Sequence, residues 1–156
     1  MTRLNLPSSM LRMALLPALL FLTGCGDGNP TVAKGVIVKG KVLRDGKPLE
    51  VPNREIGLGR VELLLISPNA NNELESALAS PDGTFEFLGP GKGVAPGSYK
   101  LVVLQQDKGF QSDMLEGAFS EAKTPIQVTI PADKIGGSHD LGTIELKTYL
   151  DQASGS

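Results

Sequence analysis

Residues 80–88 read Ser-Pro-Asp-Gly-Thr-Phe-Glu-Phe-Leu, a turn followed by a short strand of alternating polarity. Asp82 and Gly83 supply the turn, since Asp-Gly is a strong hairpin signal that uses positive φ. Phe85 and Phe87 fall on one face of the strand because side chains alternate along it. The chain has only five phenylalanines and no tryptophan, so we expect these two rings in the core. Together with residues 74–80, this stretch predicts a hairpin.

Similar short apolar runs continue on both sides of this stretch, each bounded by Gly, Pro, Asn or Asp. We expect strands at 36–43, 60–67, 74–80, 84–88, 98–105, 124–131 and 141–146. The second is apolar on both faces, as in a central strand, while prolines bracket the sixth, as in an edge strand. The spacing predicts an all-β, seven-stranded sandwich of immunoglobulin-like size.

Several short motifs occur in a fixed order along these runs. They are Val38-Lys-Gly-Lys-Val42, Asp45-Gly-Lys-Pro-Leu49, Ser80-Pro-Asp-Gly-Thr-Phe-Glu-Phe87 and Pro96-Gly-Ser-Tyr99. Gly40 would allow a bulge or close backbone approach within the first strand. Pro96 and Gly97 turn the chain into the fifth strand.

The order of these motifs resembles the transthyretin-like (prealbumin-like), carboxypeptidase regulatory-like family of β-sandwiches. The resemblance covers about residues 36–103 and weakens beyond them; residues 52–59 are long and polar for the family's loop. It implies that Tyr99 forms a tyrosine corner, in which the hydroxyl bonds nearby backbone. It also implies an accessory module that stabilises or binds partners and has no conserved chemistry of its own.

The first 24 residues predict a secretory signal, with Arg3 and Arg12 ahead of an apolar run too short to span a bilayer. Leu22-Thr23-Gly24-Cys25 resembles the lipobox of bacterial lipoproteins, which implies cleavage before Cys25 and acylation of that residue. Several acyl chains give stable anchoring. We therefore expect a signal peptide at 1–24, a lipidated Cys25 with a flexible tether at 25–35, a domain at 36–148 and a disordered tail at 149–156. The mature protein would be exported and anchored to a bacterial membrane, facing the periplasm or the exterior.

Residues able to do chemistry do not form a recognisable pattern. Gly91-Lys92 is followed by Gly93 and a strand, unlike a phosphate-binding loop. The only histidine, His139, precedes Asp140, and adjacent strand residues point to opposite faces, so a triad with Ser138 or Ser120 is not expected. We expect no catalytic residue and no cofactor.

Metal and cross-link sites are also not expected. The carboxylates of the loop at 106–123 lack EF-hand spacing; they belong to Asp107, Asp113, Glu116 and Glu121. An isopeptide bond from Lys39 or Lys41 to Asp140, assisted by Glu86, would need core positions, whereas alternation places both lysines opposite the valine face. Without residues 1–24 the chain has 13 basic and 17 acidic residues, which argues against nucleic acid as a partner.

Two functions remain open at this point. The first is a non-catalytic structural or binding lipoprotein, held by membrane lipid at Cys25, whose sandwich edges or loops contact a protein or glycan. The alternative is a calcium-dependent binder or a hydrolase built on the loops at 89–97 and 106–123.

Overall fold

The computed structural model of the chain describes residues 34–68, 74–108 and 112–154. The expected signal peptide, Cys25 and most of the tether lie outside the described residues. None of the described helices has both the length and the apolar character needed to cross a membrane.

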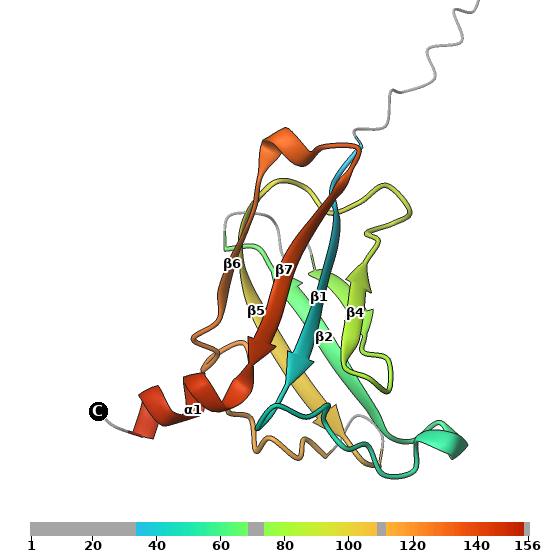
Figure 1. Cartoon of the computed structure of the whole chain (residues 1–156), viewed down its shortest axis with the longest axis vertical. Helices are drawn as coiled ribbons and strands as arrows, with labels where there is room; N and C mark the ends of the chain where they lie inside the picture. Colours follow the sequence, from blue (N-terminus) through green and yellow to red (C-terminus); the bar gives the residue numbers. More distant parts are fainter. Residues whose placement is uncertain (1–33, 69–73, 109–111, 155–156) are drawn as a thin grey trace, which may run out of the picture. The chain divides into compact units, whose positions relative to one another are not determined.

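The described residues form two β-sheets (Figure 1). A three-stranded sheet has the order β4-β1-β7, and a four-stranded sheet has the order β3-β2-β5-β6. The strands are β1 (Ile37–Leu43), β2 (Arg60–Ile66), β3 (Leu74–Leu78), β4 (Thr84–Phe87), β5 (Gly97–Gln106), β6 (Gln127–Ile130) and β7 (Ser138–Glu145). Two 3-10 turns, η1 (Arg54–Ile56) and η2 (Ala132–Lys134), and helix α1 (Leu146–Ser154) complete the order. The expected all-β, two-sheet architecture is therefore confirmed.

The core lies between the inner faces of the two sheets. Val38 and Val42 of β1 are fully buried, and Phe85 and Phe87 of β4 pack beside them. The two phenylalanine rings meet edge to face, with centroids 5.6 Å apart. Alternate residues of β2 and β5 supply the opposing layer; these are Val61, Leu63, Leu65, Tyr99, Leu101 and Val103.

Gly40 lies where β1 changes its register against β7. The two strands run parallel, and the pairing shifts between Lys39 and Lys41. A Cβ atom added to Gly40 would lie 2.6 Å from Cζ of Phe85. The absence of a side chain at Gly40 thus leaves room for the Phe85 ring within the core.

The hairpin expected from residues 74–88 does not form, and this expectation was wrong. The turn itself forms, with Ser80 N donating to Thr84 O at 2.8 Å. Beyond the turn, however, β3 pairs with β2 whereas β4 pairs with β1, so the two strands enter different sheets. The chain leaves the turn toward β1 because Gly83 O accepts a hydrogen bond from Val42 N at 2.9 Å.

The C-terminal end differs from the sequence expectation as well. A disordered tail was expected from residue 149, and the domain was expected to end at 148, but α1 is helical through Ser154. Tyr149 and Leu150 pack against the core, which stabilises the short helix. Strand β7 also begins three residues earlier than the expected Leu141, at Ser138.

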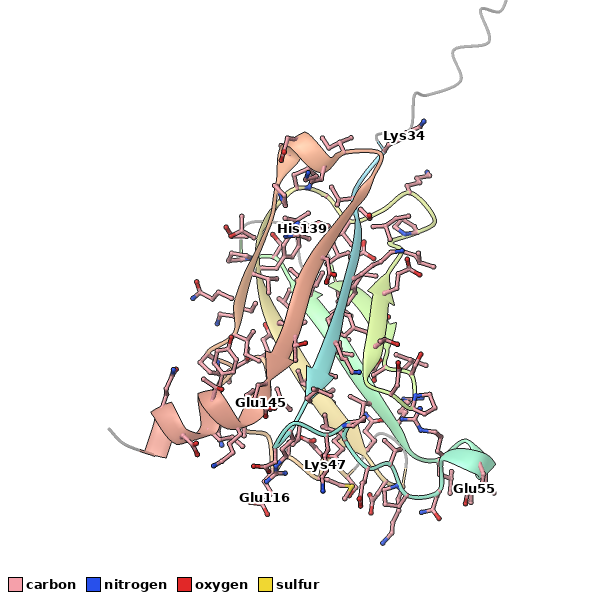
Figure 2. All side chains as sticks on the ribbon, in the orientation of Figure 1. Lys34, Lys47, Glu55, Glu116, His139 and Glu145 are labelled. Carbon is pink, nitrogen blue, oxygen red and sulfur yellow. The ribbon has the colours of Figure 1, made fainter. Side chains whose placement is uncertain are left out.

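The two ends of the sandwich are formed by different segments. Lys34, the first described residue, lies at the end formed by the turns at 88–93 and 132–137, whereas α1 and the turn at Lys47 lie at the opposite end (Figure 2). We call these the tether end and the distal end.

Candidate binding surfaces

A groove lies beside α1 at the distal end, between the helix and the loop that leads from β5 to β6. Its volume is about 570 Å³, within the range of small-molecule and peptide sites. The lining is mostly apolar and carries charge at three residues. Its apolar members are Met114, Leu115, Ala118, Phe119, Pro125, Tyr149 and Leu150, and its charged members are Arg44, Glu116 and Lys123.

Asp113 holds the loop that forms one wall of this groove. Its Oδ1 accepts hydrogen bonds from the backbone amides of Gln105 at 3.0 Å and Leu115 at 3.1 Å, and its Oδ2 accepts from Gly117 at 2.9 Å. The loop then passes through Glu116, a non-glycine residue with φ of 53°. The three amide contacts over-determine this conformation and fix the groove wall.

Glu145 connects two further segments of the distal end, the turn that follows β1 and the start of α1. Its Oε1 accepts hydrogen bonds from the amides of Asp45 at 2.9 Å and Lys147 at 3.1 Å, and its Oε2 accepts from Gly46 at 2.9 Å. Desolvation of this carboxylate opposes its ionisation, but the amides of Gly46, Lys147 and Asp45 outweigh desolvation and lower its pKa. Glu145 therefore ties the β1 turn to the start of α1 while it is ionised.

A second, shallow depression lies on the outer face of the three-stranded sheet, where Lys39 stands opposite both Glu86 and Asp140. The Lys39 amine and the Glu86 carboxylate form an exposed ion pair at 3.2 Å. The structure thus brings together the three residues of the isopeptide hypothesis, but on the solvent face rather than in the core. The isopeptide hypothesis needs core positions, and this solvent-facing arrangement of Lys39, Glu86 and Asp140 does not provide them.

Of the residues considered for a triad, Ser138, His139 and Asp140 follow one another on β7, and Ser120 lies in the loop before β6. Asp140 is exposed, and its Oδ1 accepts the amide of Gly142 at 2.8 Å. His139 is half-buried on the opposite face, in register with buried Val38. The Ser120 hydroxyl donates to the carbonyl of Gly117 at 2.8 Å. These placements give His139 no orienting contact from its neighbour Asp140.

The four loop carboxylates do not converge on a common point. Both oxygens of Asp113 accept backbone amides, as described above. A hydrogen bond from Ser112 has the largest effect on the pKa of Asp107 and lowers it. Desolvation raises this pKa by less, and the charge of Lys108 lowers it further. Within the described ranges, no group of three or more His, Cys, Asp or Glu residues has the geometry to hold a metal ion.

The motif residues at 82–99 have structural partners. The Thr84 hydroxyl donates to Asp82 Oδ1 at 2.7 Å, and this bond lowers the pKa of Asp82. Gly83 has φ of 87°, and a Cβ there would lie 2.5 Å from the carbonyl oxygen of Val42. The buried Tyr99 donates its hydroxyl to the carbonyl of Ala95 at 2.8 Å, next to the Pro96-Gly97 turn.

The groove was missed at the sequence level because residues 106–123 were expected to be a loop and only their carboxylates were considered. Two sequence features could have indicated the groove. The apolar pairs Met114-Leu115 and Ala118-Phe119 are four residues apart, and the expected tail contains the apolar pair Tyr149-Leu150. Leu115 and Phe119 in fact lie in the core.

No family model, curated protein or solved structure matches this chain.

Proposed function

We propose that this chain is an exported lipoprotein, anchored by acyl chains on Cys25, whose sandwich is a non-catalytic module that binds a protein or glycan partner at its distal end. One observation carries the proposal. The chain enters the sandwich at one end, at Lys34, and the groove beside α1 lies at the other (Figure 2). A lipid-anchored domain with this arrangement presents its groove away from the membrane.

We also propose that the sandwich is of the immunoglobulin-like, transthyretin-like and carboxypeptidase regulatory-like type. The order of the four motifs supports this assignment, as does the Tyr99 hydroxyl bonded to the backbone four residues earlier.

The engagement of the carboxylates supports a binding role over a catalytic one. Asp113 and Glu145 each accept three backbone amides, so their charges stabilise turns. A general base needs a lone pair directed at a substrate proton, whereas most of the lone pairs of these two carboxylates are directed at backbone amides.

Metabolic labelling with an alkyne fatty acid tests the anchor. The wild-type chain should incorporate label, lose residues 1–24 and fractionate with membranes, because the thiol of Cys25 is the only thiol in the chain. The variant Cys25→Ser should lack label and either remain unprocessed or leave the lipidated membrane fraction. Equal membrane fractionation of the two without label in either would overturn the lipoprotein assignment.

Site-specific photo-crosslinking tests the distal groove. A photo-reactive residue at Met114, which lines the groove and is 42% exposed, should give a discrete adduct in intact cells. The matched control is Leu58, which is 45% exposed and outside the groove. An adduct of equal intensity from Leu58, or none from Met114, would contradict binding in the groove.

The calcium-dependent alternative has a separate test. Calcium bound by the native state would raise the melting temperature in proportion to the logarithm of its concentration, through mass action. We expect equal melting temperatures in calcium and in chelator, because Asp113 is already engaged.

A further inference from the structure

We propose that the tether end of the sandwich is a membrane-docking surface that rests on anionic lipid headgroups. This inference rests on the proposed anchor at Cys25 and adds an orientation to it. The surface is formed by the turns at 88–93 and 132–137 with the entry of the chain at 34–35.

These three segments are joined by backbone hydrogen bonds. Gly35 N donates to Lys92 O, and Gly136 N donates to Gly35 O at 2.9 Å. Next along the chain, Ile37 N donates to Gly137 O at 3.0 Å. The segments therefore form one connected platform around a glycine-lined hollow of about 450 Å³.

The platform carries the two features of a lipid-facing surface. Leu88 and Ile135 project from separate turns and are 49% and 53% exposed. The same segments contain three lysines and a single acid, Asp133, so they carry a net charge of +2; the lysines are Lys34, Lys92 and Lys134. Exposed apolar residues on segments of net positive charge match the interface of an anionic bilayer, where the cations contact headgroups and the apolar side chains enter beyond them.

The distal end has the opposite charge. Its segments 44–59 and 113–118 contain three basic and five acidic residues, a net charge of −2. It also exposes apolar residues, including Ile56 at 65%. The two ends are therefore distinguished by charge rather than by apolar exposure, and an anionic surface attracts the tether end and repels the distal end.

The length of the connecting chain selects the same end. Cys25 and Lys34 are nine positions apart, so an extended chain spans at most about 30 Å between them. Acylation at Cys25 would thus hold the platform within that distance of the headgroups, at a high effective concentration. The tether and the charge both orient this platform toward the membrane.

The lack of tryptophan in the chain allows a direct test. Leu88→Trp places a reporter on the platform, and Ile56→Trp places a matched reporter at the distal end. Each acylated protein is purified from membranes and reconstituted into vesicles rich in phosphatidylglycerol, with bromine on the lipid acyl chains to quench nearby tryptophan. Intact mass of the same samples reports acylation of Cys25.

We expect strong quenching and a blue shift for Leu88→Trp and neither for Ile56→Trp. Adding Lys92→Gln and Lys134→Gln to Leu88→Trp should reduce quenching severalfold, and so should high salt. A second reporter, Ile135→Trp, repeats the measurement if Leu88→Trp alters the fold by circular dichroism.

The outcomes separate the two proposals. Acylated protein with equal quenching at both ends, no quenching of the platform reporter, or equal quenching in zwitterionic vesicles would overturn the docking surface and leave the anchor standing. A concentration-dependent shift of Leu88→Trp emission without vesicles would assign the platform to self-association instead. Protein without acyl mass would overturn the anchor and the docking surface together.

Discussion

The carboxylate of Glu145 accepts the backbone amide of Gly46 at 2.9 Å, joining residues 99 positions apart in the chain. The same carboxylate accepts the amides of Asp45 and Lys147. Asp45 and Gly46 both have positive φ, at 54° and 70°. Thus an ionised side chain at the end of β7 stabilises the tight turn that follows β1.

This contact makes stability depend on pH. The pKa of Glu145 is lower in the folded state than its ordinary value of 4.5. Its contribution is therefore complete above pH 4.5 and is lost as the pH falls through the lower folded pKa. Glu145→Gln should cost on the order of 1 kcal/mol at neutral pH and should lose less stability than the wild type on acidification. Thermal melts across the acidic range measure both effects.

The control for that prediction is Glu55→Gln, at an exposed residue of η1. Its melting curve should follow the wild type at every pH. Asp82 and Asp107 also have lowered pKa values, so part of the acid sensitivity should persist in Glu145→Gln. Identical acid profiles for Glu145→Gln and wild type would contradict the assigned role.

Gly40 should not tolerate a side chain. The added methyl of Gly40→Ala would approach the Phe85 ring to 2.6 Å, and that ring is held in the core. We expect a loss of about 1–3 kcal/mol, measured by urea unfolding. Gly137→Ala is the control, because its Cβ would meet its nearest neighbour at an ordinary 3.5 Å. Equal unfolding midpoints for the two variants would refute the packing argument.

The Tyr99 hydroxyl should stabilise the entry into β5. Tyr99→Phe keeps the buried ring but leaves the carbonyl of Ala95 without this donor. The expected loss is about 1–2 kcal/mol, from the denaturant midpoint at constant slope. Tyr149→Phe, at the other tyrosine of the chain, is expected to have a smaller effect. The reverse order would show that the corner contact is not stabilising.

Asp113 should rigidify the groove wall. In Asp113→Ala the amides of Gln105, Leu115 and Gly117 lose their acceptor. Hydrogen exchange at Leu115 and Gly117 should accelerate by about tenfold or more, whereas amides at the centre of β2 should change less. Asp113→Asn keeps one carbonyl acceptor and should give an intermediate rate. Unchanged exchange at Leu115 in the alanine variant would exclude this role for the carboxylate.

The strands were largely predictable because buried residues mostly alternate with exposed ones along them, as along Val36, Val38 and Val42. The partner of β4 was not predictable, since a turn signal at Asp82-Gly83 fits a hairpin and a change of sheet equally well. The choice depends on the long-range bond between Val42 and Gly83. Local pattern does not contain that information.

The distal groove was hidden for a related reason. Phe119 belongs to no strand, and its burial depends on a loop shaped by Asp113. Helix α1 has few residues, and it is stabilised by Tyr149 and Leu150 packing on distant parts of the chain. Tertiary contacts, rather than local propensity, determine both features.

The parallel pairing of β1 with β7 also constrains when the protein can fold. The central strand of the small sheet comes from the start of the domain, and one of its edges comes from the end. During synthesis, which starts at the N-terminus, the sandwich therefore cannot close until the residues up to 145 are available to pair with β1. Because this pairing joins strands far apart in the sequence, we expect closure of the sandwich to be a late step in folding.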